Sequence, residues 1–122
     1  MNSETLLLRQ IHPSYVQDGR TTSQAFRPTP KDEEQLSVYN GDLIAPASCW
    51  QYFTGTLKLE SAGVMALKQG ECAGQQLGVL EDGDPIPEHC SIDFSGLTNS
   101  DIKKKSQKLA AFARERGWLF VP

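Results

Sequence analysis

Cysteine is scarce in this sequence, and no two cysteines have the Cys-x-x-Cys spacing of a redox or zinc motif. The three that are present, Cys49, Cys72 and Cys90, are an odd number, whereas a secreted disulfide framework usually has an even one. Disulfides persist in oxidising compartments. We therefore expect a cytoplasmic protein whose thiols are small, buried, apolar residues.

Long hydrophobic runs are also missing. The run Leu6, Leu7, Leu8 is far too short to span a membrane, and no basic patch precedes an apolar core as in a signal peptide. The 12 Lys and Arg against 15 Asp and Glu give a net charge of −3. The sequence therefore lacks the positive balance of a dedicated nucleic-acid-binding protein, although a local basic groove is compatible with it. No membrane association is expected.

The length and the hydrophobic pattern predict one globular α+β domain over residues 1–122. We expect a single mixed or antiparallel sheet of about four to five strands, with a C-terminal amphipathic helix packed on one face. The strand candidates are residues 5–12, 21–26, 36–39, 62–67, 90–94 and 118–121, and the helix candidates are residues 46–54, 71–77 and 98–116. Because residues 62–67 are continuously apolar, we place this strand in the middle of the sheet.

Strand alternation assigns the faces of two strand candidates. In the first strand, Leu6, Leu8 and Gln10 are expected to share one face, and Leu7, Arg9 and Ile11 the other. In residues 90–94, Ser91 and Asp93 are expected to point outward. The residues that follow Gly78 are expected to form a turn-rich stretch.

The C-terminal helix is the clearest element. Thr98 with Asp101 three residues later is typical of a helix start, and Gly117 follows the basic last turn as a C-cap. One buried stripe is predicted from the helical spacing: Ile102, Ser106, Leu109, Ala110 and Ala113. Lys103, Lys104, Lys108 and Arg114 are expected to face water, whereas Lys105 borders the stripe.

A polar segment from Arg9 to Asp42 (residues 9–42) is the candidate site, because polar residues among aromatics and turn formers are more often a site than a spacer. Guanidinium groups and hydroxyls supply the fixed donors that an anion needs. The candidate ligand-binding residues are Arg9, Arg20, Ser23, Arg27 and Lys31. The alternative is that these cations pair with local carboxylates and simply anchor a long loop.

The same segment carries a resemblance. The runs HPSYV at 12–16, TSQAFRP at 22–28 and LSVY at 36–39 resemble a pattern in a family of small uncharacterised bacterial proteins. The likeness extends to residues 71–72, 88–89 and 92–96. The resemblance implies a bacterial source and attaches no activity.

Two functions follow from these patterns. The first is a small cytoplasmic binding or interaction module, which recognises an anionic small molecule or a protein partner through residues 9–42. The alternative is a small enzyme acting on a phosphate-containing substrate, a nucleotide or RNA, with His12 as general acid or base and His89 as a second proton-transfer group. No cofactor is expected, and the pattern predicts no oligomeric state.

Two other chemistries are weaker. A metal site built from His12, Cys72, His89 and Cys90 lacks the short, regular ligand spacing of structural zinc, so no metal is expected. A nucleophilic Cys72 at a helix start would need a histidine nearby, and the spacing requires none.

Overall fold

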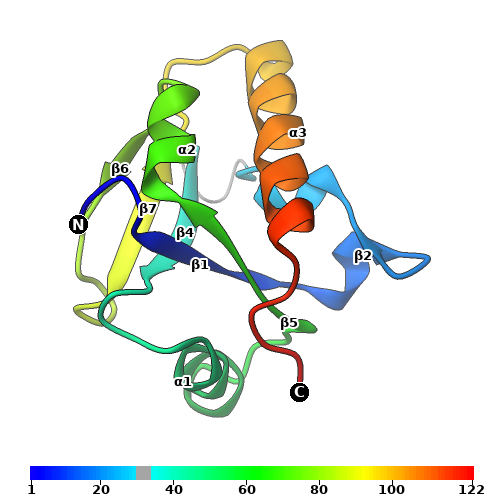
Figure 1. The fold of residues 1–122 in the computed structure, drawn as a ribbon, viewed down its shortest axis with the longest axis vertical. Helices are drawn as coiled ribbons and strands as arrows, with labels where there is room; N and C mark the ends of the chain where they lie inside the picture. Colours follow the sequence, from blue (N-terminus) through cyan, green and yellow to red (C-terminus); the bar gives the residue numbers. More distant parts are fainter. Residues whose placement is uncertain (30–33) are drawn as a thin grey trace.

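The computed structural model describes residues 1–29 and 34–122. Within these residues a five-stranded antiparallel sheet has the order β5-β1-β4-β7-β6, and β2 and β3 form a separate hairpin (Figure 1). The sheet strands are β1 (Leu6–Ile11), β4 (Gln35–Asn40), β5 (Gly63–Lys68), β6 (Gly78–Leu80) and β7 (His89–Asp93). The expected α+β class with a C-terminal helix is confirmed.

The remaining elements are short except for the last helix. The hairpin strands are β2 (Val16–Gln17) and β3 (Arg20–Thr21), flanked by the 3-10 turns η1 (Pro13–Tyr15) and η2 (Ser23–Phe26). Helix α1 (Pro46–Gln51) continues into the π-helical turn η4 (Tyr52–Thr56), and α2 (Gln69–Gly74) precedes α3 (Asn99–Arg116). None of these helices combines the length and the apolar composition that crossing a membrane requires.

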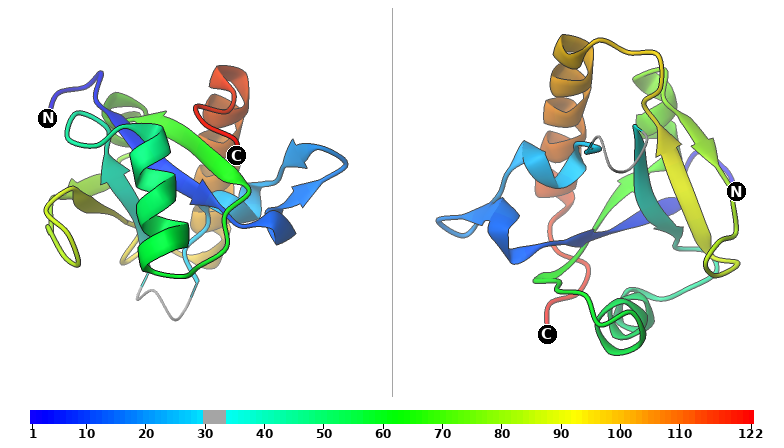
Figure 2. Two further views of the ribbon diagram at one scale, coloured as in Figure 1. Left: turned by 90° about the horizontal axis from the view of Figure 1, so that it is seen from below. Right: turned by 180° about the vertical axis from the view of Figure 1, so that it is seen from behind.

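The sheet separates two hydrophobic clusters, and Figure 2 shows α1 and α3 on its opposite sides. Leu7 and Ile11 pack with Leu109 on the α3 side. Leu8 packs with Tyr39 and the α1 residue Cys49 on the other side. The alternation predicted for the first strand is therefore confirmed, since successive side chains of a strand point to opposite faces.

Helix α3 is built as its sequence predicts. The Thr98 hydroxyl accepts a hydrogen bond from the Asp101 backbone N–H at 3.1 Å, and Gly117 ends the helix with φ at 85°, a conformation that glycine adopts without steric cost. The buried residues of the helix are Ile102, Ser106, Leu109, Ala110 and Ala113. This stripe packs α3 against the sheet and against the η2 residues Ala25 and Phe26.

The central position expected for residues 62–67 is wrong, because β5 is an edge strand. Residues of β5 are buried because α1 and α3 cover its two faces. A continuously apolar strand therefore indicates that both of its faces are covered, and it does not indicate a central position in the sheet. The outer edge is partly closed by a bridge between Val64 and Phe120. A Cβ on Gly63 would lie 2.5 Å from the Phe120 carbonyl oxygen, so only glycine admits this contact. The strand expected over residues 118–121 is reduced to that bridge.

Three smaller expectations also need correction. Residues 21–26 were expected to form a strand. Strand β3 ends at Thr21, and Ser23 to Phe26 form the η2 turn. A helical turn buries the adjacent side chains of Ala25 and Phe26 together, whereas a strand would point them to opposite faces. Ser91 was expected to face outward, yet it is 5% exposed because its hydroxyl donates to Asp82. Strand β6 lies in a stretch expected as a turn and gives the sheet its second edge.

Candidate functional site

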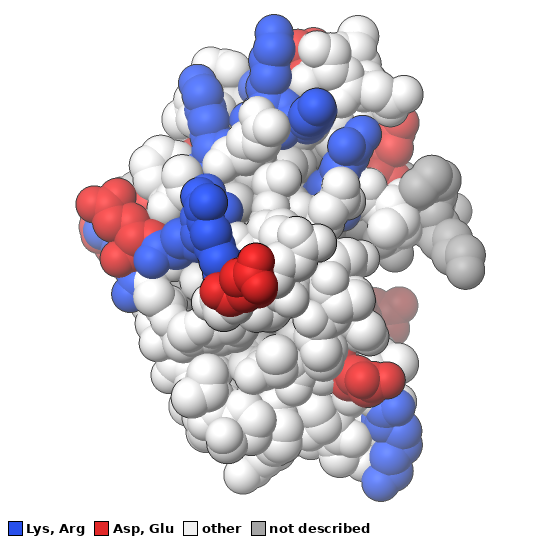
Figure 3. All heavy atoms as spheres, turned by 90° about the vertical axis from the view of Figure 1, so that its right-hand side faces the viewer, with Lys and Arg blue, Asp and Glu red and all other residues white. Residues whose placement is uncertain are grey.

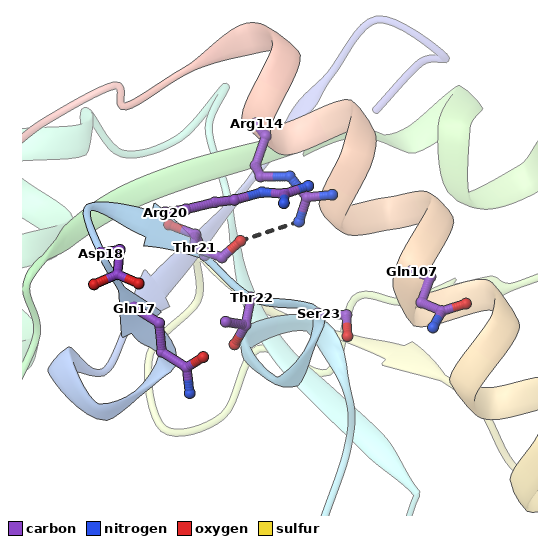
Figure 4. A pocket seen from close by; sticks show the side chains of 8 residues that line it. All are labelled: Gln17, Asp18, Arg20, Thr21, Thr22, Ser23, Gln107 and Arg114. Carbon is purple, nitrogen blue, oxygen red and sulfur yellow. Dashed lines mark hydrogen bonds between the residues drawn. The ribbon is translucent and has the colours of Figure 1, made fainter.

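A hollow of about 490 Å³ lies between the β2–β3 hairpin, the η2 turn and α3 (Figure 4). Its lining combines cations, hydroxyls and amides. The lining residues are Gln17, Asp18, Arg20, Thr21, Thr22, Ser23, Gln107 and Arg114. Six of these come from the polar segment singled out in the sequence, and the last two come from α3.

The hairpin geometry places these groups. Asp18 and Gly19 form the turn with positive φ values of 52° and 76°, a backbone conformation that Asp and Gly tolerate best. Thr22 then fixes the chain behind the hairpin, because both its N–H and its hydroxyl donate to the Tyr15 carbonyl, at 2.8 Å and 2.9 Å. Arg114 reaches from α3 and donates to the Thr21 carbonyl at 3.0 Å. The rim of the hollow is thus tied to both elements.

Two guanidinium groups share this hollow. Burial lowers the pKa of Arg114, and the positive charge of Arg20 lowers it further. In Figure 4 both side chains extend toward the same part of the hollow. Among residues 1–29 and 34–122, neither guanidinium forms an ion pair with a carboxylate, that of Asp18 included. The site therefore concentrates positive charge that the described residues do not neutralise.

Neutral donors complete the lining. The Ser23 hydroxyl and the Gln107 amide make no hydrogen bond to another group within the described part of the chain. Ser23 is half-buried, whereas Gln107 lies exposed on α3. A hydroxyl and an amide can both donate to an anion's oxygen atoms. The arrangement suits an oxyanion better than an apolar ligand.

The surroundings of the hollow are also cationic. A second hollow of about 560 Å³ runs along α3, shares Gln107 with the first and is lined by Lys104, Lys105 and Lys108. In Figure 3, most of the Lys and Arg side chains on the visible face lie in its upper half, on the side of the molecule formed by α3. Lys104 and Lys108, which were expected to face water, are exposed and place positive charge beside the hollow, despite the net charge of −3.

The other candidate residues of the segment lie elsewhere. Arg9 lines a separate hollow and donates from Nε to the Ala25 carbonyl at 2.8 Å and from Nη1 to the Ser37 carbonyl at 2.9 Å. Arg27 lines a fourth hollow, near the start of α3. Lys31 lies outside the described residues. The structure thus brings Arg20 and Ser23 together and separates them from Arg9 and Arg27.

The two histidines do not share a site. His12 follows Ile11 at the end of β1, whereas His89 pairs with Tyr39, which pairs with Leu8. Two strand spacings and four residues along the strand put their backbones about 16 Å apart. His12 lines the Arg9 hollow and accepts from the Ser14 backbone N–H at 3.1 Å. The two groups therefore cannot act on one reacting atom.

The cysteine and metal chemistries find no support in the geometry. Burial, and then the charge of Glu71, raise the pKa of Cys72 to about 12, so this thiol is not a poised nucleophile. All three cysteines are unpaired and buried. Within residues 1–29 and 34–122 no group of three or more His, Cys, Asp or Glu side chains is placed to hold a metal ion.

Arg114 and Gln107 were not predicted as site residues. Arg114 lies 93 positions after Thr21, whose carbonyl it contacts, and in the sequence it is one more cation on a solvated helix face. Comparisons of the chain with family models, with curated proteins and with solved structures found no match.

Proposed function

We propose that this protein is a binding module for an anionic small molecule, held in the hollow between the β2–β3 hairpin and α3. The observation that carries the proposal is the pair Arg20 and Arg114. Two guanidinium groups that share a hollow repel each other, and an anion between them relieves that repulsion. Each charge-assisted hydrogen bond formed to such a ligand contributes about 1.5–3 kcal/mol.

The size and the donors of the hollow limit the ligand. A volume of about 490 Å³ falls within the range of small-molecule sites, roughly 300–1,000 Å³. Guanidinium groups match the oxygen geometry of phosphate and carboxylate in a two-pronged fashion. We therefore propose a small molecule with a phosphate or carboxylate group, gripped by Arg20 and Arg114, with Ser23 and Gln107 as neutral donors.

The cell compartment we propose is a reducing bacterial cytoplasm. Support comes from the three cysteines, which are buried and unpaired, because an oxidising compartment favours disulfides.

The test is an NMR titration of the labelled protein with inorganic pyrophosphate, with sodium chloride held at equal ionic strength as the reference. We expect the amide signals of Thr21, Thr22 and Ser23 and the Gln107 side-chain amide to shift and to saturate. Arg20→Gln should abolish the saturable shift. Arg20 is the cleaner change because it is exposed, whereas Arg114 also holds the Thr21 carbonyl.

Arg27→Gln is the matched control, since it removes an arginine of the same segment from a different hollow. It should leave the titration unchanged. Without pyrophosphate, Arg20→Gln should melt at the same temperature as the wild type or higher, because the substitution relieves repulsion on Arg114. Equal loss of binding in both variants, or shifts confined to the α3 lysines, would contradict the proposed site. A protein partner in place of the small molecule would leave the pyrophosphate titration without a saturable shift.

A further inference from the structure

The face of the sheet toward α1 carries a second polar constellation, independent of the Arg20 hollow. His89 lies at its centre. Its Nδ1 is 2.6 Å from Asp82 Oδ1, and its Nε2 is 2.5 Å from Ser37 Oγ. The three groups thus form a continuous line of hydroxyl, imidazole and carboxylate.

Strand register explains why these residues meet. In the β4–β7 pair, Tyr39 lies opposite His89 and Ser37 lies opposite Ser91. Ser37 is therefore the diagonal neighbour of His89 on the same face, within reach of a long side chain. Asp82 comes from the connection between β6 and β7, and it closes over the start of β7.

The protonation states follow from the hydrogen bonds. Burial raises the pKa of Asp82, but hydrogen bonds from Ser91 and His89 outweigh it and hold the pKa below its ordinary value. An ionised Asp82 can only accept, so Nδ1 of His89 carries the proton and donates to it. In a neutral imidazole Nε2 is then the acceptor and faces the Ser37 hydroxyl, which is the arrangement of a general base beside its nucleophile.

The exposure of the three groups is graded. The His89 side chain is 10% exposed and that of Asp82 is 33% exposed, whereas Ser37 lies at the surface. The Tyr39 ring stands edge-on to the imidazole at 5.3 Å between centroids and restricts its rotation. The base is thus shielded and oriented, while the hydroxyl remains accessible to a reagent from solution.

A second Ser–His contact in the chain lacks the carboxylate that binds His89 and serves as a comparison. Ser14 Oγ lies 2.8 Å from Nδ1 of His12, but both residues are exposed, and within the described part of the chain no carboxylate is hydrogen-bonded to His12. A hydroxyl beside an unoriented imidazole is a common surface contact. The line through Ser37 has the third group that fixes the tautomer of the base.

We propose that Ser37 is an activated nucleophile that accepts an acyl group from small esters, with His89 as its general base and Asp82 as the positioning residue. The Arg9 guanidinium donates to the Ser37 backbone carbonyl and to that of Ala25 and so fixes the main chain of β4 at this position. This site faces α1, away from the Arg20 hollow, so neither proposal depends on the other.

The reaction is an acyl transfer to water. Ser37 Oγ forms a bond to the ester carbonyl carbon as its proton passes to Nε2 of His89. The bond from that carbon to the alkoxy oxygen then breaks, and the alcohol leaves with the proton from Nε2. A water molecule next attacks the acyl-serine, gives a proton to Nε2, and releases the carboxylic acid as Ser37 Oγ regains that proton. No electrons are gained or lost overall.

An active-site-directed reagent tests the nucleophile without knowledge of the natural ester. We would incubate the purified protein with a fluorophosphonate, measure the intact mass and map the adduct by peptide sequencing. One adduct on Ser37 is expected. Ser37→Ala should remove it, and His89→Gln and Asp82→Asn should slow its formation about 100-fold or more, the contribution of a general base. Ser14→Ala is the matched control and should label as the wild type does.

A thiol variant keeps the proposal testable if replacement of His89 unfolds the protein. Ser37→Cys should react with iodoacetamide at neutral pH much faster than Ser14→Cys, because the imidazole of His89 accepts the thiol proton. The native thiols add little background, since burial raises the pKa of Cys49 to about 11 and that of Cys72 to about 12. Asp82→Asn in the Ser37→Cys background should shift the pH profile of alkylation to higher pH.

Three results would overturn the proposal. The first is a folded wild type that takes up no fluorophosphonate under conditions that fully label a serine esterase. The second is equal labelling of Ser14 and Ser37. The third is equal alkylation rates for Ser37→Cys and Ser14→Cys, which would make the line of hydrogen bonds a structural link between β4, β7 and the residue 81–88 connection.

Discussion

Two ion pairs in this protein have the same length and very different surroundings, and we predict that they differ in strength. Arg116 Nη2 lies 2.7 Å from Glu71 Oε2, with side-chain exposures of 20% and 16%. Lys68 Nζ lies 2.7 Å from Glu4 Oε2, with exposures of 39% and 73%. Distance alone would make the pairs equal.

The Arg116 pair is embedded in further hydrogen bonds. Arg116 Nη1 donates to the Ala66 carbonyl at 2.8 Å, and Glu71 Oε1 accepts from the Lys68 backbone N–H at 2.7 Å. The pair thus joins the end of α3 to β5 and to the start of α2. Bonds that involve a charged group contribute about 1.5–3 kcal/mol each. After allowance for partial solvation, Arg116→Gln should lower the free energy of unfolding by about 2–3 kcal/mol.

A double-mutant cycle in urea isolates the interaction. For Glu71→Gln with Arg116→Gln we expect a coupling energy of about 1–3 kcal/mol that persists in 1 M salt. The amide oxygen of the Glu71→Gln side chain can still accept from the Lys68 N–H, so the helix start is preserved in this cycle. The cycle for Glu4 with Lys68 should give no measurable coupling, because exposed pairs are screened and entropically costly. Equal coupling in the two cycles would refute the argument that burial and the supporting hydrogen bonds set the strength.

Three further predictions concern stability and reactivity. Leu109→Ala truncates a fully buried side chain and should lower the free energy of unfolding by about 2–5 kcal/mol in urea melts, whereas Lys108→Ala on the exposed side should change it by less than about 0.5 kcal/mol. Burial raises the pKa of Asp82, but hydrogen bonds from Ser91 and His89 hold it below its ordinary value of 3.8. The stabilisation by the ionised carboxylate is therefore present above about pH 4 and is lost as the pH falls through the lowered value; Asp82→Asn should show a flatter acid limb in melting curves between pH 2 and 5, and an identical limb would contradict this assignment. Burial raises the pKa of Cys72 to about 12, so a disulfide reagent at neutral pH should modify it only at the rate of unfolding; modification within seconds in native buffer would show that the helix α2 packing is wrong.

The elements that the sequence predicted well are those whose signals are local. The buried stripe of α3 follows from helical spacing. The start of the helix follows from Thr98 and Asp101, which are three residues apart. Both signals depend only on residues that are close in the sequence. The two faces of β1 follow from strict alternation. Residues 62–67 were misplaced because continuous apolarity indicates only that both faces of the strand are covered. Whether a strand is central or at an edge depends on which strands pair with it, and these partners are distant in the sequence.

The same division holds for the sites. Arg20 and Ser23 were singled out because polar groups cluster there in the sequence, but Arg114 joins them only through the packing of α3 on the hairpin. His89 was named as a proton-transfer group without its partners. Ser37 lies 52 positions away from it and is brought close by antiparallel register, which the residue pattern around either position does not specify.

The edges of the sheet limit how another chain could associate with it. One edge, β5, is occupied at Val64 by Phe120, and the opposite edge, β6, is three residues long. A peptide that adds itself as an extra strand gains its affinity from main-chain hydrogen bonds, and the bridge at Val64 and the shortness of β6 reduce the number that it could form. Among the described residues, the helical and hairpin surfaces offer side chains whose substitution would alter contacts with another molecule without disturbing the sheet.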